Sequence, residues 1–207
     1  MNPIILSTAY FPPIAWFHLL ATHQKALIEK QENFIKQTYR TRCNILSTNG
    51  VLAITAPTLK KHDSKTPIKD IKLNNNDPWQ RKHIVAIRSA YGKSPFFIHY
   101  ADEIEAIISK EHTTLWDLNI KTISFFCDIW SIPVPKATEQ FEKAYPENDF
   151  REIIHPKKEL KGFIQEKYIQ TFSEKYPFTP GLSCLDLLFN MGPEGKDYLL
   201  KSCKYQF

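Results

Sequence analysis

The stretch Asp77-Pro78-Trp79-Gln80-Arg81-Lys82-His83 carries clear start signals for a helix. The aspartate is suited to cap the helix, the proline to occupy its first position, and the glutamine to complete a capping box. Arg81, Lys82 and His83 then gather at the positive end of the helix dipole, where each cation costs about 0.3–1 kcal/mol. Two interpretations stay open: these side chains bind a phosphate or carboxylate, or they face water at a solvated helix start.

Downstream of this stretch, the spacing of apolar residues predicts a mostly helical chain. The expected helices span 78–91, 95–108, from 113 or 114 to 130, and 182–190, with a helical piece near 167–176 and a short terminal helix. The third of these helices carries Phe125, Phe126 and Trp130 on a wide apolar surface, which predicts a central position in the core. Residues 136–162 are charged and interrupted, so we expect an extended surface excursion there.

Upstream of the stretch, short apolar runs and turn signals predict strands. The expected strands are 4–6, 26–28, 39–46, 51–56 and an edge strand at 68–73, with a helix at 14–22. The Asn49-Gly50 pair favours a type I′ turn in a β-hairpin. The order of these elements predicts an α/β fold: a mixed β-sheet with a β-hairpin covered by helices, and a C-terminal half that is mostly helical. We expect one domain over residues 1–207, or one with a small helical lobe from about 136 to 207.

The composition is that of an ordinary globular protein and sets limits on its partners. Apolar residues make up 43% of the chain of 207 residues, which is enough to build a substantial core. The net charge of +5 arises from 27 basic residues interleaved with 22 acidic ones. This pattern favours a site for small anionic molecules over a nucleic-acid interface, which usually needs a clustered basic stripe.

Cysteine and histidine spacing bears on metal binding and on the compartment. The four cysteines lie far apart and form no Cys-x-x-Cys pair, so we expect free thiols. The seven histidines show no ligand spacing, so no metal site is predicted, and no cofactor is indicated. We find no signal-peptide pattern and no apolar segment of the roughly 18 residues that a bilayer span needs. These features together favour the cytoplasm.

The segment 8–18 combines a strand end, a proline-containing turn and a helix start. In α/β folds this arrangement places a ligand at the carboxyl end of the strand and an anion at the helix N-terminus. Thr8 and Tyr10 can hydrogen-bond a ligand there, and His18 can act as an acid, a base or a phosphate contact. The competing interpretation is that His18 is a buried, hydrogen-bonded group and the aromatic residues are core.

The segment 192–198 is a second candidate ligand site. Gly192 and Gly195 allow a backbone to approach closely, and Lys196 can supply a point charge for a phosphate. The spacing is not that of a Walker A loop. A glycine after a helix C-terminus is also a routine cap, which is the competing interpretation.

In their order and spacing, these pieces resemble the motifs of the WbqC-like protein family over nearly the whole chain. The first motif is carried by Tyr10-Phe11-Pro12 and Trp16-Phe17-His18, and the second by Gln37-Thr38-Tyr39-Arg40-Thr41-Arg42, with Arg42 the closest match. The most specific block is Trp79-Gln80-Arg81-Lys82-His83, followed by Ala90-Tyr91-Gly92-Lys93-Ser94-Pro95-Phe96-Phe97. The last two motifs are Leu115-Trp116-Asp117-Leu118-Asn119 and the segment from Leu185 to Tyr198, which contains Asn190-Met191-Gly192-Pro193-Glu194-Gly195.

The resemblance implies a bacterial protein associated with surface-polysaccharide gene clusters, for which acyl or aminoacyl transfer to an amino sugar has been suggested. Many members open with a His-Gln-Pro triplet, where this chain has Leu6, Ser7 and Thr8. Either the chain lacks chemistry that depends on that histidine, or Thr8 replaces it, or the chain belongs to a divergent branch. The first motif is also similar to the strand–helix turn of nucleotidylyltransferases, whose roles Thr8, His18 and Lys196 would fill.

We therefore expect a transferase-type enzyme of surface-polysaccharide assembly, an acyl-, aminoacyl- or nucleotidyl-transferase, that acts on an anionic, nucleotide-linked sugar substrate. The alternative is a non-catalytic ligand-binding or scaffold protein that has kept the family fold. The candidate catalytic residues are His18, His83 and Thr8. The candidate substrate-binding residues are Tyr10, Arg42, Trp79, Arg81, Lys82, Tyr91, Asn190, Gly192, Glu194 and Lys196.

Spatial clustering separates the two alternatives. Convergence of the polar candidates on one pocket would favour the enzyme, and their dispersal would favour the scaffold. We expect Arg42, Arg81 and His83 to form an anion site that faces the turn at 10–18, because a guanidinium offers a planar fork to phosphate or carboxylate.

The cysteines give a first prediction. Alkylation of the denatured chain without reductant should add four labels, because no pair is expected to form a disulfide. Intact-mass spectrometry measures the number of labels. Two labels or none would reveal a disulfide and contradict the expected compartment.

Overall fold

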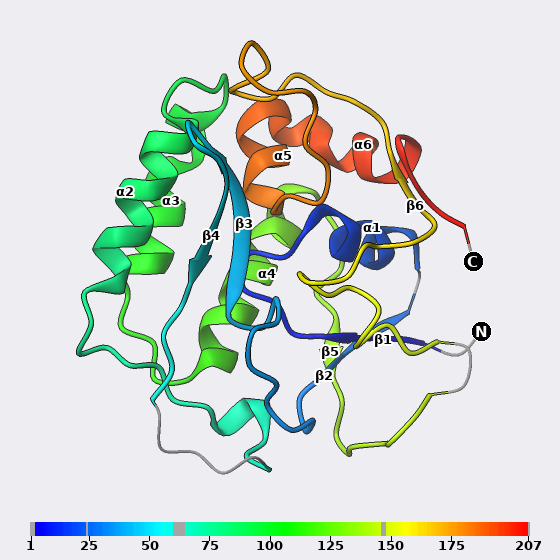
Figure 1. Ribbon diagram of the computed structural model, residues 1–207. Coiled ribbons are helices and arrows are strands. Elements are labelled where there is room, and N and C mark those ends of the chain that lie inside the picture. The colour runs from blue at the N-terminus through cyan, green and yellow to red at the C-terminus, as the bar shows by residue number, and fades with distance from the viewer. Residues whose placement is uncertain (1–2, 24, 60–64, 146–147, 207) are drawn as a thin grey trace.

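The parallel sheet at the centre of the fold consists of three strands (Figure 1). β2 (Ala26–Glu29) lies between β1 (Ile4–Ser7) and the short β5 (Lys136–Ala137), and all three run in one direction. α1 (Ile14–Thr22) connects β1 to β2, and every residue of β1 is buried, as expected for a parallel strand covered on both faces. The computed structural model describes residues 3–23, 25–59, 65–145 and 148–206.

Two antiparallel strand pairs accompany this sheet. β3 (Arg42–Ser47) and β4 (Gly50–Thr55) form the predicted hairpin, but its turn is not the type I′ turn that Asn49-Gly50 favours. Ser47 pairs with Gly50, so Thr48 and Asn49 are the two loop residues, and neither has the positive φ that a type I′ turn requires. Gly50 has a φ of 96°, which a glycine adopts without strain. β6 (Phe163–Gln165) pairs with β7 (Cys203–Tyr205). The prediction of an α/β fold with strands in both orientations and a hairpin is therefore confirmed, with the parallel and antiparallel strands in separate sheets.

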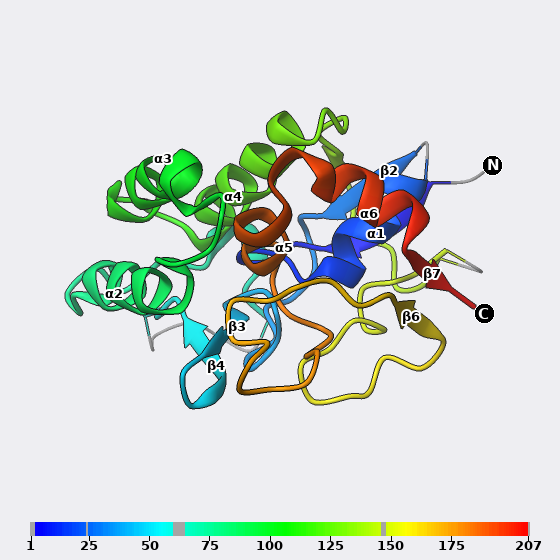
Figure 2. The ribbon, with the colours of Figure 1, turned by 90° about the horizontal axis from the view of Figure 1, so that it is seen from above.

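The helices fall into two groups around these strands (Figure 2). α2 (Trp79–Tyr91) and α3 (Phe97–Ser109) pack on each other beside the hairpin, and α4 (Leu115–Ile129) follows them. α5 (Cys184–Met191) and α6 (Gly195–Lys201) lie against α1. Within the described residues, none of these helices combines the length and apolar character needed to cross a lipid bilayer.

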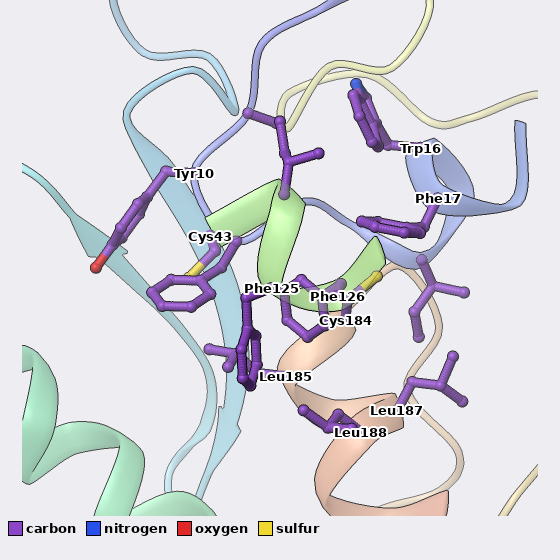
Figure 3. Packing of buried hydrophobic residues seen from close by; sticks show 14 of the residues in the cluster. Tyr10, Trp16, Phe17, Cys43, Phe125, Phe126, Cys184, Leu185, Leu187 and Leu188 are labelled. Atoms are coloured by element: carbon purple, nitrogen blue, oxygen red, sulfur yellow. The ribbon is translucent and has the colours of Figure 1, made fainter. Parts of the chain in front are cut away.

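α4 lies in the middle of the core, as its wide apolar surface predicts (Figure 3). The Phe126 side chain is fully buried, and its ring centroid lies 5.3 Å from that of Trp130 and 5.6 Å from that of Phe17. The ring centroid of Phe11, in the turn after β1, lies 6.2 Å from that of Phe126. A single cluster of buried apolar residues extends from β1 to β7, so both ends of the chain share one core.

The predicted edge strand at 68–73 is wrong. Ile68–Asp70 forms a short 3-10 helix (η1), and Lys72 and Leu73 take part in isolated bridges. Ile68 and Ile71 are both fully buried, and their spacing of three residues matches the three residues per turn of a 3-10 helix. The apolar residues Ile68, Ile71 and Leu73 suggested the alternation of a strand, but the first two are spaced for one 3-10 turn.

The predicted helical piece at 167–176 is also wrong, because this segment consists of extended chain and turns. The Gln170 side chain is buried and spans to Thr179, whose carbonyl accepts from it at 2.9 Å and whose amide donates to it at 2.8 Å. Ile169 is 82% exposed, so the apolar residues here share no buried face. A side chain that bonds to backbone groups competes with helix formation.

The start of α2 differs in detail from its prediction. Pro78 takes the N-cap position and no side chain caps the helix. The Asp77 carboxylate instead pairs with Lys82 Nζ at 2.7 Å on the exposed surface. The helix begins one residue later than expected, which moves the carboxylate away from the cap position.

Truncation of the central aromatic ring tests the place of α4. Phe126→Ala should lower the free energy of unfolding by about 3–5 kcal/mol, because a fully buried phenyl group leaves a cavity. Ile98→Ala is a suitable control, since Ile98 is 82% exposed and its truncation should change stability by less than about 0.5 kcal/mol. Urea denaturation measures both variants, and equal stabilities would place α4 outside the core.

Candidate functional site

A buried hydrogen bond joins the turn after β1 to α2. The Tyr10 hydroxyl lies 2.9 Å from His83 Nδ1, and both side chains are almost completely buried. Figure 3 shows the Tyr10 hydroxyl pointing away from the Phe125 and Phe126 rings. Trp79 lies one helical turn before His83, and its ring packs against the imidazole at a centroid distance of 5.1 Å. The first turns of α2 therefore fix this pair.

His83 is held as a neutral imidazole. Burial lowers its pKa to about 4, although a hydrogen bond to the Thr55 backbone acts in the opposite direction. Both bonds are satisfied when Tyr10 donates to Nδ1 and the other ring nitrogen donates to the Thr55 carbonyl. Burial also raises the pKa of Tyr10 far above its usual value, so the hydroxyl keeps its proton.

Arg42 stands beside this pair on the hairpin. It is the strand partner of Thr55, the residue whose backbone holds His83. Arg42 is partly buried, and within the described residues its buried Nε atom has no hydrogen-bond partner. A buried N–H without a partner is costly, so the guanidinium is available to an acceptor. The positive charge of Arg42 lowers the pKa of Tyr39, but burial outweighs it and raises this pKa to about 12.

A cleft of about 290 Å³ opens at the N-terminus of α1, which we call the α1 cleft. Ala15 of α1, Tyr39, His155, Lys158 and the acidic Glu159 contribute to its wall. Figure 1 shows the segment around 150–162, drawn in yellow, beside α1. Within the described residues the Ala15 amide makes no hydrogen bond, whereas the Trp16 amide donates to the Pro13 carbonyl. An amide of this kind at a helix N-terminus favours an anion.

His18 lies on the same face of α1 as Ala15, one turn further along. Its Nδ1 lies 2.8 Å from the Leu199 carbonyl and therefore carries the proton of the neutral ring, which leaves Nε2 as the basic nitrogen. Burial lowers the pKa of His18. Its ring packs against Phe163, which also lines the α1 cleft. His18 is thus a buried, neutral imidazole that contacts the cleft wall through Phe163 and is not itself part of the lining.

A network of buried ion pairs occupies the carboxyl end of β2. Arg40 binds Glu32 through two hydrogen bonds of 2.7 and 2.6 Å, with 2% and 6% of the two side chains exposed. Glu29, the last residue of β2, accepts from Thr138 at 2.6 Å and from Arg151 at 3.4 Å. These groups satisfy one another, as buried charges require.

The sequence analysis missed this network. Its members are far apart along the chain, and only Arg40 falls inside a motif, where Arg42 drew attention instead. A cavity of about 520 Å³ adjoins the network and is lined by Glu32, Asp149 and Arg151 among others. Within the described residues, no group of three or more histidine, cysteine or acidic side chains is placed to hold a metal ion.

A second missed group surrounds Asp186 in the first turn of α5. Its carboxylate is fully buried and accepts hydrogen bonds from the Tyr168 hydroxyl and, at 3.0 Å, from Gln170 Nε2. Burial raises the pKa of Asp186 to about 6. These bonds hold the segment before α5 against the helix, which indicates a structural role.

A model described as the WbqC-like protein family matches residues 8–161. The chain belongs to this family. The match takes in the turn after β1, the hairpin and α2 to α4, and thus the Tyr10–His83 pair and Arg42. It also includes part of the α1 cleft wall, up to Leu160.

A similar full-length relative is known. It is the uncharacterized protein Rv1507c of Mycobacterium tuberculosis, which is 24% identical over an alignment of 223 residues, gaps included. The alignment covers 94% of this WbqC-like chain and 96% of the relative. No solved structure matches the chain. The comparisons therefore establish the family and leave the activity to be inferred from the site.

The other motif residues of this WbqC-like protein are distributed over several places. Thr8 is fully buried, and within the described residues its Oγ1 has no hydrogen-bond partner. Arg81 is exposed, and Lys82 is also exposed with its pairing to Asp77. Tyr91 is buried, and its hydroxyl accepts from the Leu46 amide at 3.4 Å. The structure thus brings together Tyr10, Trp79 and His83 beside Arg42, and leaves Arg81 at the surface.

The closing motif of the WbqC-like chain contributes to packing. Asn190 Nδ2 donates to the Asp186 carbonyl at 2.8 Å, and the Gly192 carbonyl accepts from Trp130 Nε1 at 3.1 Å. Glu194 is exposed, and Lys196 Nζ donates to the Ser131 carbonyl at 3.1 Å, remote from the α1 cleft lining. A Cβ atom at position 195 would lie 2.8 Å from Trp130 Nε1, so this glycine allows an indole to approach.

The buried titratable groups predict a pH dependence of stability. Between pH 6.5 and 4 the unfolded chain binds a proton at His83 that the folded chain does not, so stability falls as the pH decreases, by on the order of 3 kcal/mol. Asp186 acts in the opposite direction, because its folded pKa of about 6 lies above the ordinary 3.8 and its contribution is lost as the pH rises.

Two variants separate these contributions. His83→Gln should make the slope of stability against pH less positive between pH 4 and 6.5, and Asp186→Asn should make it more positive. Chemical denaturation at a series of pH values measures the slope. Equal slopes in both variants and the unmodified chain would show that neither group is buried as described.

Proposed function

We propose that this WbqC-like protein is a transferase-type enzyme that binds a small anionic substrate, of the nucleotide-linked sugar class, in the α1 cleft. The observation that carries the proposal is the position of this cleft. It lies at the carboxyl side of β1 and at the N-terminus of α1, where the Ala15 amide is free and Lys158 supplies positive charge beside Glu159. Burial and Lys158 lower the pKa of His155, so this side chain contributes a neutral ring. An enzyme of bacterial surface-polysaccharide assembly, as the family suggests, would use such a site.

The size of the cleft limits what it holds. Small-molecule sites have volumes of about 300–1,000 Å³, and the cleft, at about 290 Å³, lies at the lower end of this range. We therefore assign it to a phosphate or carboxylate group with an adjoining sugar ring rather than to a whole sugar nucleotide. The Tyr39 ring and Phe163 provide an apolar wall for that ring.

The proposed chemistry uses His18 as a base. In a transfer reaction the acceptor hydroxyl or amine loses a proton while it forms a bond to the acyl carbon or phosphorus of the donor, and an anionic group leaves. The basic Nε2 of His18 would take the proton, because Nδ1 already donates to the Leu199 carbonyl. Lys158 and the helix N-terminus would stabilise the departing anion. The Tyr10 amide donates to the Tyr39 carbonyl at 2.9 Å, so the turn that carries the Tyr10–His83 pair also holds Tyr39 in the cleft wall.

The alternative is a non-catalytic ligand-binding or scaffold protein, and one observation favours it. The candidates do not converge on one pocket: Arg81 lies on the surface, and Lys196 borders a different cavity. Tyr10 and His83 are buried with their hydrogen bonds satisfied, which is typical of structural groups. An activity measurement must therefore accompany any measurement of binding.

Calorimetric titration with pyrophosphate, nucleotides and sugar nucleotides tests the cleft. Lys158→Met should weaken the binding of the best ligand by about 10- to 100-fold, the range for a hydrogen bond to a charged group. Lys161→Met, an exposed neighbour outside the cleft lining, should change it less than about two-fold. Loss of binding in Arg81→Ala instead would move the anion site to the start of α2.

His18→Gln separates the enzyme from the scaffold. If the chain is a transferase, this variant should bind the ligand with nearly unchanged affinity and lose turnover by at least about 100-fold. Product formation from sugar nucleotides and amino-sugar acceptors is followed by mass spectrometry. Ligand binding without turnover in the unmodified chain would support the scaffold.

A further inference from the structure

A second cavity lies at the opposite, amino end of the parallel sheet, which we call the amino-end cavity. Its volume is about 650 Å³, larger than that of the α1 cleft. It is bordered by the starts of the parallel strands, the C-terminal turn of α1 and the segment 131–136 that follows α4. The proposed function makes no use of it.

Most of the inner lining of this cavity is apolar. Leu20 and Ala21 of α1, Leu27 of β2, and Ile132 and Val134 contribute aliphatic side chains. Val134 is 46% exposed, so part of this apolar surface faces the open space of the cavity. Burial of such surface against an apolar ligand is favourable by roughly 25 cal/mol per Å².

Three lysines, Lys25, Lys136 and Lys196, stand around this apolar body, and no carboxylate is among the lining residues. Within the part of the chain that the structure describes, none of the three forms an ion pair. Lys25 follows the C-terminus of α1, where the helix dipole favours a cation. Lys136 and Lys196 come from β5 and α6, so the dipole of α1 does not explain their presence.

The turn that ends α4 forms the lip of the cavity. Ser131 has a φ of 48°, which a residue with a side chain rarely adopts. Lys196 Nζ donates to the Ser131 carbonyl at 3.1 Å and so fixes this turn. The Ile132 amide donates to the Cys127 carbonyl at 2.9 Å and the Ser131 amide to the Asp128 carbonyl at 3.3 Å. This is the Schellman arrangement that commonly ends a helix, so the positive φ belongs to the C-cap of α4.

We propose that the amino-end cavity binds an amphipathic anion, a single carboxylate or phosphate carried on an aliphatic tail. The tail lies along Leu20, Leu27 and Val134, and the anionic head meets Lys25, Lys136 and Lys196. This ligand matches both the apolar body and the unpaired positive rim, whereas an inorganic anion would use only the rim. The site is separate from the α1 cleft and stands whether or not the proposed function holds.

Calorimetric titration of the full chain with octanoate, decanoate and decyl phosphate, each below its micelle concentration, tests the proposal. Affinity should rise about four-fold for each added methylene, because burial of one methylene contributes about 0.8 kcal/mol. Decyl glucoside, which has the same tail and no charge, should bind at least about ten-fold more weakly than decanoate. Decanoate and decyl phosphate distinguish a carboxylate head from a phosphate head.

Matched lysine variants locate the site. Lys136→Met and Lys196→Met should each weaken decanoate binding by about 5- to 10-fold, whereas Lys201→Met, on the exposed side of α6 and paired with Asp197, should leave it unchanged. Val134→Trp should block the tail and reduce the dependence on chain length. Lys158→Met in the α1 cleft should have no effect, so failure here is distinguishable from failure of the proposed function.

Three titration results would overturn the inference, as would one result with vesicles. They are no binding of decanoate at its solubility limit, equal binding of inorganic phosphate and decyl phosphate, and equal loss in the Lys136 and Lys201 variants. Binding to phosphatidylglycerol vesicles without binding to monomeric decanoate would also overturn it, because it would assign the lysines to a membrane-facing surface.

Discussion

The packing of Phe126 and Trp130 on α4 is the contact on which the rest of the structure depends. Phe126 meets Phe11 and Phe17, so it fixes the turn after β1 and the position of α1. The Trp130 indole donates to the Gly192 carbonyl, so it fixes the start of the last helical segment as well. One aromatic face thereby holds together elements from both ends of the chain.

The position of α1 follows from this contact and determines where ligands can bind. Its N-terminus opens on the α1 cleft, and its C-terminus borders the amino-end cavity. Ala15 lines the α1 cleft and Leu20 lines the amino-end cavity, so the two cavities approach to about 7.5 Å along the helix axis. The buried ion pairs of Arg40 and Glu32 hold the loop before the hairpin, which supplies Tyr39 to the cleft wall.

Much of the fold was predictable because local signals and the core agree. The hairpin, the apolar run of α4 and the short strands 4–6 and 26–28 all reappear in the structure, although the hairpin turn is not of type I′. The errors at 68–73 and 167–176 arose where single residues dominate: two isoleucines spaced for a 3-10 turn, and one glutamine that bonds to Thr179. Such contacts leave no periodic pattern in the sequence.

The candidate site was predictable only in part, for a related reason. The proximity of Tyr10 and His83 follows from motifs that lie in order along the chain, but the residues His155 and Lys158 of the cleft wall come from a charged segment without a motif. The pairing of Arg40 with Glu32, and of Glu29 with Arg151, depends on the tertiary course of loops. Charge alone did not distinguish a buried arginine from an exposed one, as the contrast between Arg40 and Arg81 shows.

The contact between Trp130 and Gly195 has a consequence for how this protein can change in evolution. A side chain at position 195 would overlap the indole, and a smaller residue at position 130 would leave a void beside the glycine. Each substitution alone should lower stability, whereas the two together can restore a filled interior. The two positions, which lie 65 residues apart, should therefore vary as a pair, and a lineage could cross from one solution to the other only through an unstable intermediate.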